Sequence, residues 1–211
     1  MLRDLLDALR CPMPHEESWL VAMVYEAEGP LLRRADLSCP VCAAEYIIRD
    51  GIARFAEPLA GRDDRAPDPM RLAALLGVTD GHLPVLLSGR YTLAGDALGA
   101  LIPVPQVWVN AQAVARPGAP GLSEMLVRDR VPLGVATLAA AAVDATHATP
   151  AMLASVIRAV QQGGHVIAPA ETPLPDGLKE LARDGEEWVA EVTARASGLI
   201  ELRRRAPDAV G

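Results

Sequence analysis

Cysteine and aromatic residues are both scarce in this 211-residue chain. Three cysteines are an odd number, which argues against a framework of disulfides and fits a cytoplasmic protein with reduced thiols. Aromatic residues make up 3% of the chain and hydrophobic residues 51%, so a core has to be built mainly from Ala, Val and Leu. Such a core suits closely packed helices and helices layered on a sheet.

Positive charge and long apolar runs are also lacking. The formal net charge is −7, which excludes broad, non-specific nucleic-acid binding because phosphate contacts need a basic face. Local contacts with nucleic acid stay possible at the arginine clusters 33–34 and 203–205. Solvated surface is the simpler interpretation of both clusters. No apolar run approaches the roughly 20 residues of a membrane span. The opening "MLRDLLDALR" carries charges where a signal peptide needs an apolar stretch.

The first segment, residues 1–57, has the pattern of a small α+β unit. "LRDLLDALR" (2–10) has leucines at helical spacing and predicts a short amphipathic helix. Two strands are expected around the Gly29-Pro30 turn, followed by the "CPVC" knuckle and a short strand in "AEYIIRDG" (44–51). Residues 58–69 are rich in Pro, Gly and charge and are interpreted as a linker.

The second segment, residues 70–211, alternates apolar runs with helical patterns. We expect helices over 150–164, with Pro150 at the start, and over 176–185. Strands alternating with helices predict an α/β, Rossmann-like, mostly parallel and doubly wound sheet. The expected strands are 83–89, 105–111, 131–137, 140–146, 165–169 and a closing pair within 187–205.

The three cysteines and one histidine have the spacing of a metal site. Cys39 and Cys42 form a C-x2-C knuckle that turns both sulfurs toward one point, and Cys11 and His15 are close enough to come from one loop. Two such pairs separated by strand-forming residues are what a tetrahedral zinc site needs. Four protein ligands leave no open position, so the expected zinc is structural and would stabilise a segment with a small core.

Two alternatives stay open for this cluster. The residues are ordinary thiols and a loop histidine, or the segment is a ribbon without metal. Pro14 stands where a second C-x2-C knuckle would have its cysteine, and His15 fills that place one position later. Glu16 and Glu17 are weaker substitutes.

"LLDALRCP" together with "LSCPVCAAEYIIRDGIARF" resembles the zinc-ribbon proteins that bind and activate partner methyltransferases in tRNA and release-factor modification. The similarity covers residues 2–56, and "IRDGI" (48–52) is its most specific part. Ile47 replaces the family's usual proline. The resemblance implies a ribbon that binds a protein partner, a methyltransferase or a larger complex, and that is not itself a catalyst.

The pattern of residues 70–211 resembles a class I S-adenosylmethionine-dependent methyltransferase, most closely over 139–169. That resemblance implies cofactor contacts from Gly89 after the first strand, Asn110 after the second and Asp144 after the fourth. Three places where the family is strict are weakened. Bulky residues follow Gly89 at the first turn, Asn110 replaces an acidic residue at the end of the second strand, and the end of the third strand, in "GVATLAA", has no Asp. Asn hydrogen-bonds a ribose hydroxyl without charge assistance.

Asp144 and His147 follow an expected strand, at the edge where ligands bind in open α/β sheets. Together they are candidates for acid–base work, although polar caps of the next helix are the simpler interpretation. No G-x-S-x-G elbow and no Walker loop is present.

The sequence therefore favours an interaction protein, a scaffold or activator in which a zinc ribbon precedes a methyltransferase-like unit that has lost catalysis. The alternative is an active S-adenosylmethionine-dependent methyltransferase whose ribbon recognises an RNA or protein substrate. A sensor that retains a nucleotide-like ligand is a third hypothesis. Self-association of the chain stays open.

Overall fold

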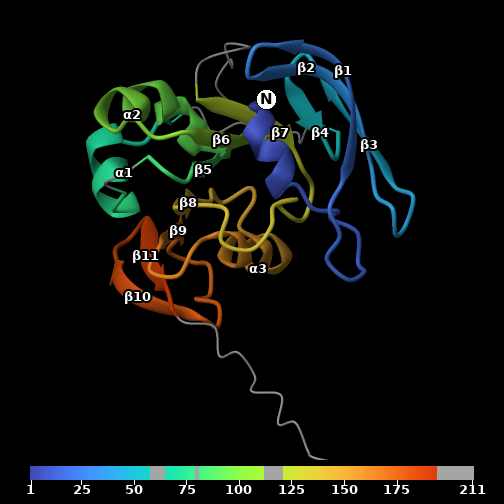
Figure 1. The fold of residues 1–211 in the computed structure, drawn as a ribbon. Coiled ribbons are helices and arrows are strands. Elements are labelled where there is room, and N and C mark those ends of the chain that lie inside the picture. The colour runs from blue at the N-terminus through green and yellow to red at the C-terminus, as the bar shows by residue number, and fades with distance from the viewer. Residues whose placement is uncertain (58–64, 79–80, 112–120, 194–211) are drawn as a thin grey trace, which may run out of the picture.

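The structure, a computed structural model, describes residues 1–57, 65–78, 81–111 and 121–193. Within these ranges, eleven strands form one mixed sheet in the order β1-β2-β3-β4-β7-β6-β5-β8-β9-β11-β10 (Figure 1). The strands are β1 (Val21–Glu28), β2 (Leu31–Ser38), β3 (Glu45–Arg49), β4 (Ile52–Arg54), β5 (Val85–Ser88), β6 (Gln106–Val109), β7 (Leu122–Leu126), β8 (Ala140–Ala142), β9 (His165–Pro169), β10 (Leu178–Arg183) and β11 (Glu187–Val192). The helices are η1 (Arg3–Ala8), α1 (Pro69–Leu76), η2 (Gly89–Ala94), α2 (Gly95–Leu101) and α3 (Pro150–Ala159), where η marks a 3₁₀ helix.

The first segment forms an antiparallel flank of the sheet. β1 and β2 are joined at Gly29, whose positive φ of 56° suits glycine, and this confirms the two strands expected around that turn. β3 and β4 continue the antiparallel order. β4 then pairs in parallel with β7, with Ile52 opposite Glu124 and Arg54 opposite Leu126. Residues 1–57 and the rest of the chain therefore share one hydrogen-bonded sheet.

The middle of the sheet is parallel, and its strand order reverses at β5. β6 and β7 lie on one side of β5, and β8 and β9 lie on the other. β11 inserts antiparallel to β9 and pairs with β10 at the far edge. The expectation of a mostly parallel, doubly wound sheet for residues 70–211 is therefore confirmed only in part. β11 and β10 pair antiparallel within that segment, and the antiparallel flank of residues 1–57 makes the whole sheet mixed and mostly antiparallel.

The sheet carries an apolar layer on each face because its central strands are buried on both sides. Along β5, Leu86 belongs to one core cluster, whereas Val85 and Leu87 belong to the other. The first cluster includes side chains of η1 and α3, and the second includes side chains of α1, η2 and α2 (Figure 1). The N-terminal 3₁₀ helix thus covers the same face as α3.

Two helices begin with a side-chain cap. α3 begins at Pro150 as expected, whereas α1 was not expected and begins at Pro69, within the expected linker. The Asp68 side chain accepts a hydrogen bond from the Met70 N–H at the start of α1, and Thr149 does the same for Met152 at the start of α3. Each helix has proline at its first turn. α3 is shorter than the expected 150–164, because the chain after Ala159 turns extended and Val160 forms a parallel bridge to Leu138.

Two expected elements are wrong. Residues 131–137 form only an isolated bridge, between Leu133 and Leu9, and the third parallel strand is instead β7. Residues 176–185 contain strand β10 in place of the expected helix, because pairing with β11 outweighs the helix propensity of "LKELAR". The opening helix is 3₁₀. Residues 58–64 of the expected linker, and the closing segment from 194, lie outside the described residues.

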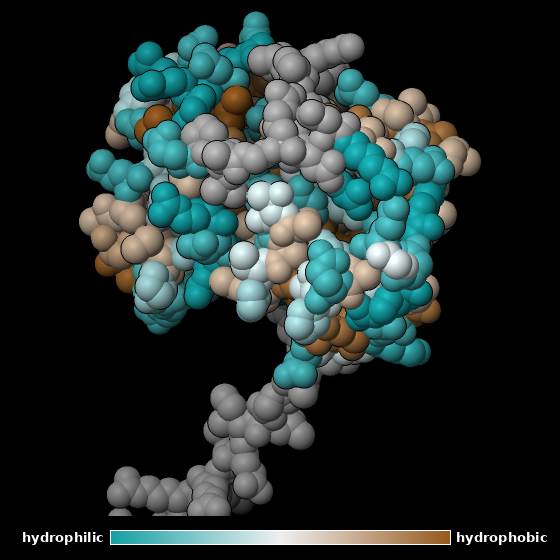
Figure 2. All heavy atoms as spheres, turned by 180° about the vertical axis from the view of Figure 1, so that it is seen from behind, coloured by the Kyte–Doolittle hydropathy of each residue, from teal (hydrophilic) through white to brown (hydrophobic). Residues whose placement is uncertain are grey.

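The surface mixes polar and apolar groups. Seen from behind, it is mainly hydrophilic, with hydrophobic residues in separate groups (Figure 2). Among the helices that the structure describes, none is long and apolar enough to cross a membrane.

Candidate functional sites

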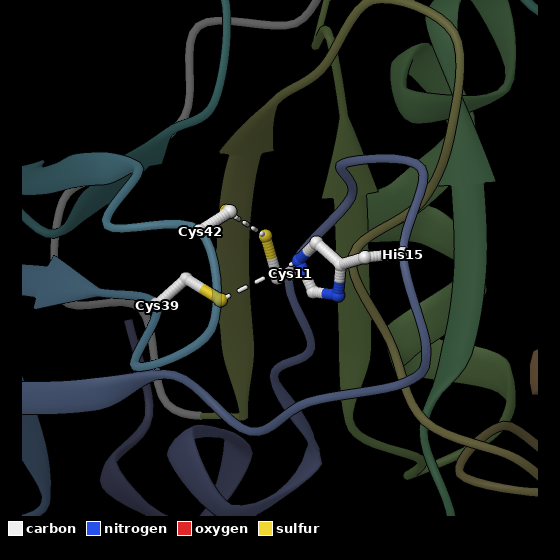
Figure 3. A group of neighbouring side chains, drawn as sticks. All are labelled: Cys11, His15, Cys39 and Cys42. Carbon is white, nitrogen blue, oxygen red and sulfur yellow. Dashed lines mark hydrogen bonds between the residues drawn. The ribbon is translucent and has the colours of Figure 1, made fainter.

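The first candidate site is the cluster of Cys11, His15, Cys39 and Cys42 (Figure 3). Cys11 and His15 come from the loop between η1 and β1, and the other two from the turn between β2 and β3. The cluster therefore draws on two segments that are separated in sequence and brought together by the antiparallel flank. Its four ligand atoms all lie within 4.8 Å of one another, so the group could hold a metal ion.

The spacing of the ligand atoms fits a tetrahedral ion. Cys11 Sγ lies 3.7 Å from Cys42 Sγ, and Cys39 Sγ lies 3.5 Å from His15 Nε2. Bonds of about 2.3 Å to sulfur and about 2.0 Å to nitrogen require roughly 3.8 Å between sulfurs and 3.5 Å between sulfur and nitrogen in a tetrahedron. These two separations therefore match those of a tetrahedral zinc site.

Local hydrogen bonds orient both halves of the cluster. The Cys11 N–H donates to the Ser18 carbonyl at 3.0 Å, which closes the loop that carries His15. His15 Nδ1 contacts the Glu16 carbonyl, and a proton on Nδ1 leaves Nε2 free to face the sulfurs. In the knuckle, the Cys39 carbonyl accepts from the Ala43 N–H, and Ala43 has a positive φ of 56°. This tight turn brings Cys42 back toward Cys39.

The two halves of the cluster differ electrostatically. Burial raises the pKa of the Cys11 thiol to about 11. Burial also acts to raise the pKa of Cys39, but hydrogen bonds from the N–H groups of Cys42 and Val41 outweigh it and lower that pKa to about 6. The knuckle thus stabilises a thiolate at Cys39. Cys11 needs a cation nearby before it ionises at neutral pH.

Sequence reasoning missed Tyr46 as a neighbour of the cluster. Its hydroxyl lies 3.7 Å from Cys11 Sγ, and its ring lies 4.8 Å from that of Phe55, between ring centroids. Burial, and then the contact with Cys11, raise the pKa of Tyr46. The position of a tyrosine within a strand gives no signal of such a contact, because it depends on how β3 faces the opening loop.

The second candidate site is the point where the strand order reverses, between β5 and β8, the place where open α/β sheets bind ligands. Gly89 follows β5 with a φ of +50°. A Cβ atom at Gly89 would stand 1.9 Å from Asp144 Oδ2. The same carboxylate oxygen accepts a hydrogen bond from the Arg90 N–H at 3.0 Å. The side chain of Asp144 therefore occupies the glycine turn itself.

Further contacts fix Asp144 in this place. Its N–H donates to Ser88 Oγ at 3.0 Å, and its Oδ1 contacts His147 Nδ1. Asp144 is 2% exposed and His147 is 3% exposed, so the pair is buried. His147 Nε2 has no hydrogen-bond partner within the described part of the chain.

Asn110 follows β6 directly, beside this turn, and is also buried. Its side-chain N–H donates to the Val127 carbonyl at 2.9 Å, and its side-chain oxygen accepts from the Val127 N–H at 3.0 Å. Both hydrogen-bonding groups of the amide are used to hold the loop after β7. The structure thus places Gly89, Asn110 and Asp144 together, just after the carboxyl ends of neighbouring parallel strands. Hydrogen bonds within the chain engage the side chains of Asn110 and Asp144.

Because β7 is the third parallel strand, the residues that follow it differ from those expected. The segment expected to end that strand has no acidic residue, but Asp129 follows β7 closely. Asp129 is exposed and lines a cavity of about 290 Å³, together with Tyr46, Phe55 and Met13. This carboxylate therefore lies on the side of the metal cluster, at the surface.

No family model matches the chain, and no curated protein does either. Its neighbours among solved structures include methyltransferases. A geranyl diphosphate methyltransferase in complex with GPP and sinefungin is 14% identical with a TM-score of 0.40, over 47% of this chain and 43% of that one. A complex between the Haloferax volcanii Trm112 methyltransferase activator and a methyltransferase is 18% identical with a TM-score of 0.39. The match covers 47% of this chain and 49% of that one.

The antibiotic-resistance methyltransferase Kmr is 14% identical with a TM-score of 0.40, over 62% of this chain and 95% of that one. The chain thus spans less than half the length of the first two neighbours.

Proposed function

We propose that the chain is a non-catalytic scaffold or activator, in which a zinc ribbon (residues 1–57) is joined through 58–69 to a Rossmann-like, methyltransferase-like unit (residues 70–211). The observation that carries the proposal is Asp144 seated on the Gly89 turn, where its Oδ2 accepts the Arg90 N–H at 3.0 Å. In a nucleotide-binding sheet, the backbone groups of such a turn face the ligand. Here a side chain of the same chain binds them.

Asn110 supports the same conclusion. A group that grips ribose hydroxyls needs free acceptor atoms, but the Asn110 amide is committed to Val127 through two hydrogen bonds. Displacing Asp144 and Asn110 together would leave buried donors without acceptors, at a cost of about 1–3 kcal/mol for each group. This cost would be subtracted from the affinity of any cofactor.

Zinc is the metal that the ribbon's ligand set favours. Three thiols and an imidazole whose ligand atoms all lie within 4.8 Å of one another suit a soft-to-borderline ion with four ligands. Cys11, His15, Cys39 and Cys42 would hold the ion, and its contribution would be to fix the loop before β1 against the β2–β3 turn. The site has a structural role in this proposal.

The test is a calorimetric titration of the purified, zinc-loaded protein with S-adenosylmethionine. We expect no saturable binding heat, and an Asp144→Asn variant serves to check that charge alone is not the obstacle. Saturable one-to-one binding by the wild-type protein would overturn the proposal.

An active methyltransferase is the second candidate, with an RNA or protein substrate. The observation that favours it is the buried Asp144–His147 pair, because Asp144 orients an imidazole whose Nε2 has no partner in the described residues. An imidazole held in this way is able to take a proton from a methyl acceptor. The same titration separates this candidate from the first, since methyl transfer requires cofactor binding.

A further inference from the structure

The loop that carries two of the metal ligands, residues 11–16, has little of its own to hold it in place. Its sequence, "CPMPHE", includes two prolines, and Met13, its one large aliphatic side chain, is 46% exposed. A segment with few buried apolar contacts opens easily, so the position of its ligands depends on how its two ends are fixed. Both ends carry a charged residue, Arg10 before the loop and Glu17 after it.

The backbone and a side-chain pair close this loop at the same place. The Cys11 N–H donates to the Ser18 carbonyl at 3.0 Å, and Arg10 and Trp19 form an antiparallel bridge. Beside this bridge, Arg10 Nε donates to Glu17 Oε1 at 3.1 Å. The ion pair therefore reinforces the backbone closure at the base of the metal loop.

Arg10 is itself held by its surroundings. Its guanidinium donates to the carbonyl groups of Asp7 at 2.8 Å and Leu9 at 2.9 Å, and it lies 4.6 Å from the centroid of the Trp19 ring. A Cβ atom at Gly134 would stand 3.0 Å from the same guanidinium. The Arg10 side chain is 12% exposed, so its position is better defined than that of an ordinary surface arginine.

Glu17 also connects the loop to α3. Its second carboxylate oxygen, Oε2, contacts Nη1 of Arg158 in the last turn of α3. Nη2 of Arg158 donates to the Leu133 carbonyl at 2.8 Å. The two oxygens of Glu17 are thus divided between Arg10 and Arg158. Glu17 is therefore engaged, and its carboxylate is not free to replace His15 as a ligand.

We propose that Arg10, Glu17 and Arg158, which we name the ionic clamp, position residues 11–16 for zinc. The inference rests on the zinc site proposed above and adds α3 to its support, although Glu17 and Arg158 are 141 positions apart. A loop held in its bound shape loses less conformational entropy when the ion binds, so the clamp raises zinc affinity. Coupling of this kind is reciprocal, so zinc in turn stabilises α3.

The first test is the zinc dissociation constant of the full chain, measured by competition with a chromophoric chelator at neutral pH. Glu17→Gln keeps the size of the side chain but removes the charge that the two arginines share, and we expect zinc to bind roughly three- to tenfold more weakly. Glu16→Gln is the matched control. It removes the same charge from the same loop, and in the described structure the Glu16 side chain has no hydrogen-bond or ion-pair partner, so its effect should be smaller than in Glu17→Gln.

The outcomes of this titration separate the clamp from the zinc site. Equal zinc affinity of the wild type and Glu17→Gln, or an equal loss in both variants, overturns the clamp and leaves the zinc site standing. A wild type that binds no zinc overturns the zinc site and the clamp with it. A contact that serves stability alone would lower the melting temperature of the metal-free protein without changing zinc affinity.

The second test follows hydrogen exchange in α3 with and without zinc. We expect zinc to slow amide exchange several-fold more in α3 than in α1, which packs on the opposite face of the sheet, and this excess should disappear in Glu17→Gln. α1 is the internal control, because a general stabilisation by zinc would slow exchange in both helices alike. An equal change in the two helices, or an excess that survives in Glu17→Gln, overturns the coupling to α3.

Discussion

The metal cluster and the turn at β5 are both places where polar side chains from distant segments converge, but they differ in what satisfies those side chains. In the cluster, Cys11 Sγ lies 3.7 Å from Cys42 Sγ and Cys39 Sγ lies 3.5 Å from His15 Nε2, separations suited to a shared ion. At the turn, Asp144 accepts the Arg90 N–H at 3.0 Å and contacts His147. A bound ion would supply the partner that the side chains of the cluster share. At the turn, the chain itself already supplies the hydrogen-bond partners, except for His147 Nε2.

A site whose side chains lack hydrogen-bond partners gains free energy when a ligand binds. A site whose partners are already supplied by the chain has to break hydrogen bonds first. The predictions below test each side of this contrast.

The largest effect is expected from Cys39→Ser. Loss of this thiolate removes one of four ligands, so bound zinc should be lost and the melting temperature should fall, because zinc binding stabilises the folded state. Zinc content by mass spectrometry and circular dichroism would measure both. Val41→Ala, on the same knuckle but without a ligand atom, is the control; a metal-free wild type and a Cys39→Ser variant that melts normally would contradict the prediction.

Gly89→Ala tests how tightly the turn is closed. A Cβ atom there meets Asp144 Oδ2 at 1.9 Å, and the φ of +50° is strained for alanine, so the free energy of unfolding should fall by roughly 2–4 kcal/mol. Chemical denaturation would measure this. Gly163→Ala is the matched control, with a φ of +79° but nothing within 4 Å of the new Cβ, so it should lose only roughly 1–2 kcal/mol.

A double-mutant cycle sharpens the result. Asp144→Ala removes the atoms that the new methyl group meets, so the combined variant should lose less stability than the sum of the two single variants. Strict additivity would mean that the two sites do not compete for the same space.

Asn110→Asp tests the neighbouring strand end. An aspartate is what the methyltransferase pattern has there, but its carboxylate cannot donate to the Val127 carbonyl. We expect a loss of about 1–3 kcal/mol in the free energy of unfolding and no gain of S-adenosylmethionine binding. Denaturation and calorimetry would check the two parts, and a more stable variant that binds cofactor would contradict both.

The last prediction concerns the pH dependence of zinc affinity. Cys11 has a pKa of about 11 in the metal-free protein, so at lower pH its proton has to leave before zinc binds. This thiol alone should raise the affinity about tenfold for each pH unit upward, below pH 11. Cys39, with a pKa of about 6, adds to the slope only below that pH. Competition with a chromophoric chelator between about pH 7 and pH 9 would measure the slope.

The sequence predicted the features that are coded locally. Cys39 and Cys42 on a two-residue knuckle, the Gly29 turn and the proline at the start of α3 each depend on a few adjacent residues. The sequence also predicted four of the parallel strands, β5, β6, β8 and β9, because buried strands are short, continuous apolar runs bounded by turns.

The features that it missed depend on distant partners. "LKELAR" in β10 favours a helix, and only its ladder with β11 makes it a strand. Residues 131–137 are as apolar as a strand, but Pro132 and Gly134 interrupt any ladder, and β7 takes the place between β6 and β4. The contact between Asp144 and the Gly89 turn could not be predicted either. It joins residues that are far apart in sequence, and nothing in "VDATH" shows that Asp144 reaches Gly89.

The parallel ladder between β4 and β7 has a consequence for dilution. Both strands belong to one polypeptide, so their association does not depend on protein concentration, unlike the docking of two separate chains. A cell with few molecules of this protein would keep the ladder as fully formed as a cell with many.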